Sequence, residues 1–239
     1  MLTLRKHKIS RLEEFSDAVF GFALTLLVIT TDVPRSYDQL IGLLQGIPAF
    51  ACCFALLVWI WREHDQFFER YPLQDGVTVC LNSALLFSVL LYIYPLKFMF
   101  DSFMKQVFGL QSSAPVVGMS LNELARASVI YGLGFFILMG LFSLMYLHAY
   151  RQRAALEMTD VDAFDARALA GHHLVSAGVG LFAMLFALIA PREMAFLSPS
   201  SFALMGPGHW AFAAWIDRRR KAVIARLTAA EAASEVQAV

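Results

Sequence analysis

The sequence predicts an all-α fold, a polytopic integral membrane protein with six transmembrane helices in a single repeat. Of its 239 residues, 59% are hydrophobic and only 16% are charged, and the mean hydropathy is +0.61. This is more apolar surface than a soluble domain of this size carries. Five uncharged runs reach the roughly 20 residues that cross a bilayer as a helix, and a shorter apolar run precedes them.

The first predicted helix covers residues 13–31. Glu13 and Glu14 open it, and acidic side chains favour the positive end of a helix dipole. Pro34 follows shortly after its end, because proline cannot continue the helical hydrogen-bond ladder. Asp17 stands at the start of the apolar part, where a charge is costly in lipid. We therefore expect Asp17 to face protein or water.

The other predicted helices cover residues 40–61, 77–96, 127–150, 168–191 and 194–216. The last contains Gly206-Pro207-Gly208, so we expect it to be kinked or broken, with a re-entrant segment as the alternative. Residues 101–126 form a long connection. Apolar residues at helical spacing mark its start, and we expect them to lie in the membrane interface.

The positive charges predict the orientation. Fourteen Lys and Arg fall at the N-terminus, in the second and fourth connections and in the tail, against five on the opposite side. Both termini are therefore expected to be cytoplasmic. We divide the chain into a transmembrane domain, residues 1–216, and a basic, helical tail, residues 217–239, anchored at the anionic leaflet by Arg218, Arg219, Arg220 and Lys221.

Several function classes are disfavoured. A net charge of zero argues against nucleic-acid binding. Cys52, Cys53 and Cys80 fall inside apolar runs, which does not support a disulfide framework or a metal knuckle. The adjacent His172 and His173 point in different directions on a helix, so we expect polar interfacial residues rather than metal ligands. No nucleophile has a plausible base, so we expect neither an enzyme nor a cofactor.

One face of the first helix carries a continuous stripe. At 100° per residue it is formed by Arg11, Phe15, Ala18, Phe22, Thr25, Leu26 and Ile29. From spacing alone, ordinary helix packing explains this stripe as well as a specialised surface does. Ser16 and Asp17 lie about 120° and about 140° from Phe22 around the helix, so we expect them to bond to neighbouring helices.

The segment Arg-x-x-x-Phe-Ser-Asp-Ala-Val-Phe at residues 11–20, followed by an apolar run with Thr25, resembles a known first-helix signature. It is that of the six-helix potassium channels related to the animal lysosomal potassium leak channel. In bacteria this family has one repeat per chain. The resemblance implies a homotetramer in the bacterial plasma membrane, built around the first helix, that passes potassium ions in preference to sodium.

The resemblance also assigns roles along the stripe. It places the pore constriction and selectivity region at Phe22, Leu26 and Ile29, with Thr25 as a hydroxyl layer and Ala18 and Phe15 lining the pore on the cytoplasmic side. The position of Phe22 is usually aliphatic in the family. Apolar rings of this kind gate by dewetting. Because potassium loses its water more cheaply than sodium, we expect a modest potassium preference.

A second set of residues is expected to hold the first helix in place. Trp61 and His64 resemble the Trp-x-x-His element of the family, and Asn82 matches a polar residue of the third helix. The resemblance implies a bracing network of these three residues with Arg11, Ser16 and Asp17. Asp65 stands where a second histidine often follows in the family.

Two other functions remain open from the sequence. A secondary transporter would favour midplane charges and inverted repeats, and neither is visible. A non-conducting membrane scaffold would use the stripe only for packing. For a scaffold, a polar substitution of Leu26 would weaken assembly without altering any current.

Overall fold

The computed structural model describes residues 10–29, 33–109, 120–191, 194 and 197–237. Over these residues the chain forms seven α-helices and one short 3-10 helix, η2. The elements are α1 (Arg11–Ile29), α2 (Tyr37–Gln45), α3 (Ile47–Arg70), α4 (Gly76–Phe108), α5 (Leu121–Arg151), α6 (Asp160–Ile189), η2 (Pro199–Leu204) and α7 (Met205–Gln237). The all-α prediction is therefore confirmed for the described part of the chain.

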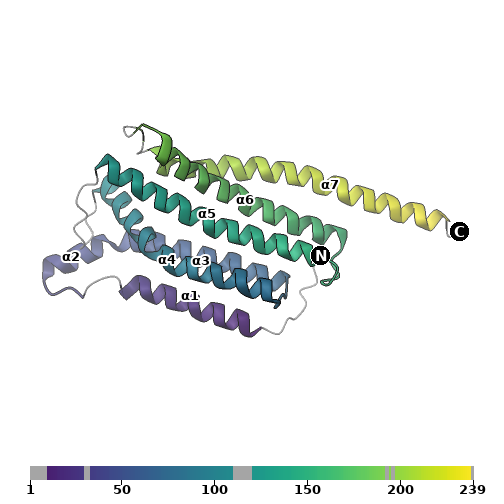
Figure 1. Ribbon diagram of the computed structural model, residues 1–239, viewed down its shortest axis with the longest axis horizontal. Coiled ribbons are helices and arrows are strands. Elements are labelled where there is room, and N and C mark those ends of the chain that lie inside the picture. The colour runs from purple at the N-terminus through teal and green to yellow at the C-terminus, as the bar shows by residue number, and fades with distance from the viewer. Residues whose placement is uncertain (1–9, 30–32, 110–119, 192–193, 195–196, 238–239) are drawn as a thin grey trace.

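The long helices run back and forth as a bundle (Figure 1). In this view α1 lies along one side, α7 along the opposite side, and α3 to α6 between them. The start of α1, the α3–α4 and α5–α6 connections and the C-terminal half of α7 all lie at the same end. We call it the termini end; it carries the clustered positive charges of the sequence.

The single helix predicted over residues 40–61 is wrong. The structure has two helices, because α2 ends at Gln45 and α3 begins at Ile47, with Gly46 between them. Pro48 stands in the first turn of α3, where its missing N–H has no intrahelical partner to lose. Gly46 therefore ends α2, and Pro48 marks the start of α3.

The helix predicted over residues 77–96 is longer in the structure. Asp75 caps α4 through the backbone N–H of Thr78 (3.0 Å), and the helix continues through Pro95 to Phe108. The apolar residues after 100, expected as an interfacial segment, prolong this same helix. It ends at Gly109, whose φ of 67° suits glycine. Although burial opposes the shift, hydrogen bonds from Thr78 and His148 lower the pKa of Asp75 to about 2.

The last helix begins later than the predicted residue 194. The short 3-10 helix precedes it, and Gly206-Pro207-Gly208 stand in the first turns of α7, where proline does not interrupt the ladder. α7 runs along the bundle and past its end (Figure 1), and the alternative of a re-entrant segment stays a prediction. α7 crosses residue 216 without a break, so the division there stays a prediction.

Four helices, α3, α4, α5 and α6, have the length and apolar composition to cross a membrane. Within the described residues α1 and α7 do not meet that standard, because charged side chains fall inside both. Over the described residues the chain is thus all-helical, with four candidate membrane spans. The packed core lies between these helices, with Phe67, Phe142 and Tyr146 fully enclosed.

Candidate functional site

The first turn of α1 is fixed by a reciprocal cap. The Ser10 side chain accepts a hydrogen bond from the Glu13 backbone N–H, and Glu13 Oε1 accepts one from the Ser10 backbone N–H, both at 3.2 Å. This arrangement satisfies two backbone donors that the helix leaves without partners. The helix therefore starts at a defined residue, which fixes the position of each following side chain along the helix axis.

One face of α1 packs against its own bundle. Ser16, Phe20, Ala23 and Leu27 are buried, at positions four, three and four residues apart. They lie on the side of α1 that packs against α3 and α4. This packed face sets how α1 is rotated about its axis.

The face that carries the predicted stripe points away from the bundle. Phe15, Phe22 and Ile29 are 59%, 56% and 67% exposed. Ala18 and Thr25 are also exposed, and Leu26 is half-buried. Thr25 Oγ1 donates to the Gly21 carbonyl (2.9 Å), so its hydroxyl oxygen keeps acceptor capacity. A single chain leaves this largely apolar face without protein cover.

Asp17 bonds to α3. Trp61 Nε1 donates to Asp17 Oδ1 over 2.8 Å, joining residues 44 positions apart in sequence. Both side chains lie toward the surface, and Asp17 is exposed. The contact gives the carboxylate an indole N–H partner, which offsets part of the cost of a charge at the start of an apolar helix.

Ser16 is the first member of a buried chain of hydrogen bonds across three helices. Asn82 Nδ2 on α4 donates to Ser16 Oγ (2.9 Å), and Ser16 donates to the Leu12 carbonyl (2.8 Å). The Asn82 oxygen lies 2.7 Å from His64 Nε2 on α3. An amide oxygen only accepts, so the Nε2 of His64 carries the proton. All three side chains are at least 98% buried.

The six residues of the predicted bracing network therefore fall into two bonded sets and one separate residue. One set is Asp17 with Trp61, and the other is Ser16, Asn82 and His64. Arg11 is exposed and, within the described residues, makes no hydrogen bond or ion pair to either set. Asp65, the departure from the family pattern, pairs with Arg62 of its own helix (2.8 Å).

A known protein family matches the part of the chain that contains α1 and the residues bonded to it. Residues 11–92, which run from the start of α1 to the middle of α4, match the model of the endosomal/lysosomal potassium channel TMEM175 family. A protein of Marivirga tractuosa named potassium channel is 37% identical over 188 residues, covering 76% of each chain. The chain belongs to the TMEM175 family. The residues matched by the family model include both bonded sets, Asp17 with Trp61 and Ser16 with Asn82 and His64.

Solved structures agree with the TMEM175 assignment. A variant of the potassium channel MtTMEM175, crystallised with a nanobody–MBP fusion, is 33% identical, with a TM-score of 0.81 over 90% of this chain and 97% of that one. A homologue, from Chamaesiphon minutus, of the lysosomal potassium-selective channel TMEM175 has the same fold at 21% identity and a TM-score of 0.57, covering 84% of this chain and 96% of that one. The relatives more than 30% identical are named as potassium channels and not as enzymes, so this chain belongs to a family of potassium channels.

The structure also contains a buried polar residue that sequence reasoning placed elsewhere. His173 is 1% exposed and stacks on the rings of Phe142 and Tyr146 at 5.1 and 5.2 Å, so the expected interfacial position is wrong. Its Nε2 lies 3.5 Å from Glu63 Oε2. The neighbouring His172 lies against another histidine on α7. Adjacent histidines in sequence do not reveal which one faces the core.

Proposed function

We propose that the chain is a passive, potassium-preferring cation channel in which four copies assemble around α1. The observation that carries the proposal is the exposed apolar face of α1. Phe22 and Ile29 are more than half exposed in one chain, and burying apolar surface favours association. A closed ring of subunits turns four such faces toward one axis.

In this assembly the stripe lines the pore. Phe22, Leu26 and Ile29 form the constriction, with the Thr25 hydroxyl between the first and second rings, and Ala18 and Phe15 line the wider part below. Phe22 to Ile29 spans about 10 Å at 1.5 Å per residue. Gly21 has no neighbour within 4 Å of where a Cβ would lie, so the Phe22 ring has space on that side to turn.

The constriction selects by dehydration. Apolar walls give an ion nothing in place of its water, so a narrow apolar ring opposes conduction by dewetting. The free energy of dehydration is smaller for potassium than for sodium. A constriction that selects on this difference alone gives a modest preference for potassium rather than a strict one. The Thr25 oxygen is the one polar side-chain group of the constriction positions and stabilises a partly dehydrated cation there.

The two bonded sets brace the pore helix. Asp17 with Trp61, and Ser16 with Asn82 and His64, bond α1 to α3 and α4 on sides away from the stripe. They fix its rotation, and therefore which residues face the axis. Arg11 continues the stripe toward the cytoplasm.

The proposed topology has six spans, α1 and α7 together with α3 to α6, in the bacterial plasma membrane. The termini end carries most of the Lys and Arg residues, and positive charge stays on the cytoplasmic side. Both termini are therefore assigned to the cytoplasm.

The decisive test is ion flux through purified protein in liposomes. We expect the wild type to pass potassium faster than sodium, and Phe22→Ala and Leu26→Asn to change the rate or the selectivity. The control is Phe87→Ala, which removes an equally exposed ring from α4 (64% exposed) and should leave flux unchanged. A folded tetramer that is silent in every version contradicts the channel and favours the scaffold. Saturating flux, or flux driven by a coupled gradient, favours the transporter.

A further inference from the structure

A cavity of about 880 Å³ lies between the end of α5, the start of α6 and α7. The segments that line it lie on the opposite side of the bundle from α1, toward the termini end (Figure 1). The α5–α6 connection lies beside it, where α5 ends at Arg151 and α6 begins at Asp160. The cavity therefore extends inward from the level at which two membrane spans end.

Three arginines from three segments line this space. Arg153 and Arg167 place their guanidinium carbons 4.8 and 5.1 Å from the centre of the Tyr150 ring, and Arg219 lies 4.6 Å from the centre of the Trp215 ring. Ring stacking orients each guanidinium without occupying all its N–H donors. Asp160 is the one acidic residue among the lining residues, which leaves a net positive charge of about two.

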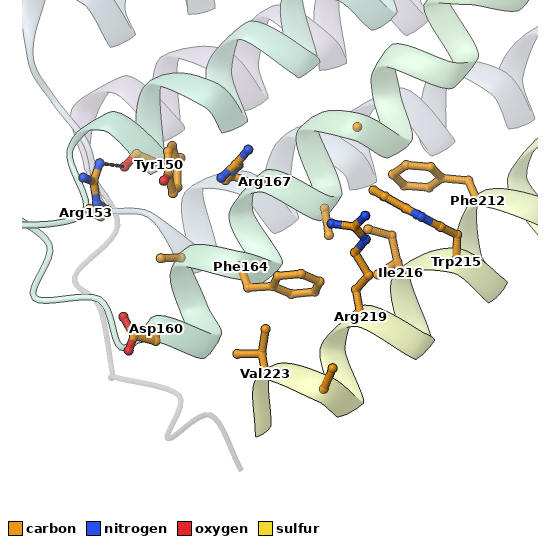
Figure 2. Close-up of a pocket in the computed structure, with 14 residues that line it drawn as sticks. Tyr150, Arg153, Asp160, Phe164, Arg167, Phe212, Trp215, Ile216, Arg219 and Val223 are labelled. Atoms are coloured by element: carbon orange, nitrogen blue, oxygen red, sulfur yellow. Dashed lines mark hydrogen bonds between the residues drawn. The ribbon is translucent and has the colours of Figure 1, made fainter. Parts of the chain in front are cut away.

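The remaining walls are apolar. Phe164 of α6 and Phe212 and Ile216 of α7 line the cavity, and Figure 2 shows Phe164 and Arg219 pointing into the space between the two helices. From Asp160 to Gly171 the α6 wall runs about 16 Å, at 1.5 Å per residue. A basic rim over a long apolar wall is complementary to a molecule with an anionic head and a hydrocarbon tail.

We infer that this cavity binds an anionic phospholipid of the surrounding membrane. The phosphate contacts the Arg167 and Arg219 guanidinium groups, and Arg153, on the other side of the Tyr150 ring, adds positive charge at the rim (Figure 2). The first part of an acyl chain lies along Phe164, Phe212 and Ile216. Guanidinium groups bind phosphate through two N–H donors at once, and basic pockets beside membrane helices at the cytoplasmic surface take lipid head groups. Tyr150 and Trp215 suit this depth, because amphipathic rings gather at membrane interfaces.

The site also joins α7 to the bundle. Arg220, next to Arg219, pairs with Asp165 of α6 through two hydrogen bonds of 2.9 and 3.1 Å beside the cavity. The bound lipid adds a second bridge, since its head group contacts α6 through Arg167 and α7 through Arg219. Lipid binding should therefore stabilise the folded chain, in proportion to the bound fraction.

The test uses the delipidated full chain in detergent, with thermal unfolding and native mass spectrometry as readouts. Dioleoyl phosphatidylglycerol is compared with dioleoyl phosphatidylcholine, which has the same acyl chains, and with inorganic phosphate. We expect phosphatidylglycerol to raise the melting temperature and to remain bound more than phosphatidylcholine. Equal effects of the two lipids overturn the inference. If inorganic phosphate has the same effect as phosphatidylglycerol, the site binds a free anion, and the inference of a bound lipid is overturned.

The variant combines Arg153→Gln, Arg167→Gln and Arg219→Gln. We expect it to lose the difference between the two lipids. Its control combines Arg62→Gln, Arg70→Gln and Arg151→Gln, which removes three exposed charges outside the cavity and should keep the difference. A retained difference in the first variant contradicts the site.

A second variant keeps all three arginines and fills the apolar part. Ala222 lines the cavity, and Ala222→Trp should lower retention of both lipids. Unchanged retention contradicts an acyl chain in this space, even if the triple arginine variant fails to fold. Both results are independent of ion flux, so they do not depend on the proposed pore.

Discussion

The α5–α6 pair and α1 are held in the bundle by different kinds of contact. α5 and α6 approach closely enough that a Cβ on Gly132 would lie 2.7 Å from the Gly180 carbonyl oxygen, and one on Gly180 would lie 2.9 Å from that of Gly132. In contrast, α1 is held by one packed face and two polar contacts. At these glycines the α5 and α6 backbones leave no space for a side chain between them, whereas side-chain hydrogen bonds position α1, whose other face stays open. The closely packed α5–α6 pair therefore belongs to the interior framework of the bundle, while α1 lies at its edge with one face exposed.

The largest expected loss of stability comes from separating α5 and α6. Gly132→Ala combined with Gly180→Ala should destabilise the fold by about 3 kcal/mol, since overpacking costs roughly 1–3 kcal/mol per site and the atoms met are backbone. Gly140→Ala with Gly178→Ala is the matched control on the same two helices, because neither Cβ would have a neighbour within 4 Å. Thermal unfolding in detergent measures both. Equal melting temperatures would remove the distinction between the two regions.

The buried hydrogen-bond chain should rank second. Asn82→Ala leaves Ser16 and His64 without their side-chain partner, which costs roughly 1–3 kcal/mol. Ser88→Ala on the same helix is the control, because the Ser88 hydroxyl donates to the carbonyl one turn earlier (2.7 Å) and bonds to no other helix in the described part of the chain. Unfolding in a denaturant titration compares them. No greater loss for Asn82→Ala would mean that α1 is held by apolar packing alone.

The exposed contact between Asp17 and Trp61 should contribute less. Trp61→Phe keeps an aromatic ring but removes the indole donor, and we expect a loss of about 1 kcal/mol. Asp17→Asn is the companion variant, because its amide oxygen still accepts from Trp61 and should cost less. A larger loss for Asp17→Asn than for Trp61→Phe would show that the negative charge has another partner.

The smallest change in stability is expected on the open face of α1. Thr25→Val removes a hydroxyl whose hydrogen bond, among the described residues, stays within its own helix, so the free energy of unfolding should shift by no more than about 0.5 kcal/mol. Potassium flux in liposomes should fall, because the constriction loses its polar oxygen. A loss of stability comparable to that of Asn82→Ala would mean that the stripe packs rather than lines a pore.

Much of the helical layout is predictable from residue patterns. The spans near residues 127–150 and 168–191 follow from uncharged length, and α5 and α6 contain them almost entirely. Hydropathy does not predict the break at Gly46, because Gly46 and Pro48 lie inside one long apolar run and barely change its mean hydropathy. The start of α7 was missed because apolar residues from 194 continue the pattern across the 3-10 turn. Hydropathy reports where the chain is apolar, not where its hydrogen-bond ladder is interrupted.

The candidate site was predictable only in part. Helical periodicity groups Phe15, Phe22 and Ile29 on one face, but it does not say whether that face packs or stays open. The partners of Ser16 and Asp17 lie 66 and 44 residues away in sequence and entered through the family resemblance alone. Arg11 was grouped with them, and the structure separates it.

The sequence by itself determined that this chain is a helical membrane protein, which residues of α1 share a face, and the family to which it belongs. These follow from local chemistry, because apolar length, helical spacing and a contiguous motif are properties of neighbouring residues. Only the tertiary structure decided that α1 turns Ser16 inward and Phe22 outward. It also decided that α5 and α6 meet at two glycines and that Arg153, Arg167 and Arg219 surround one cavity. Each of these depends on how helices distant in sequence pack, which no local pattern encodes.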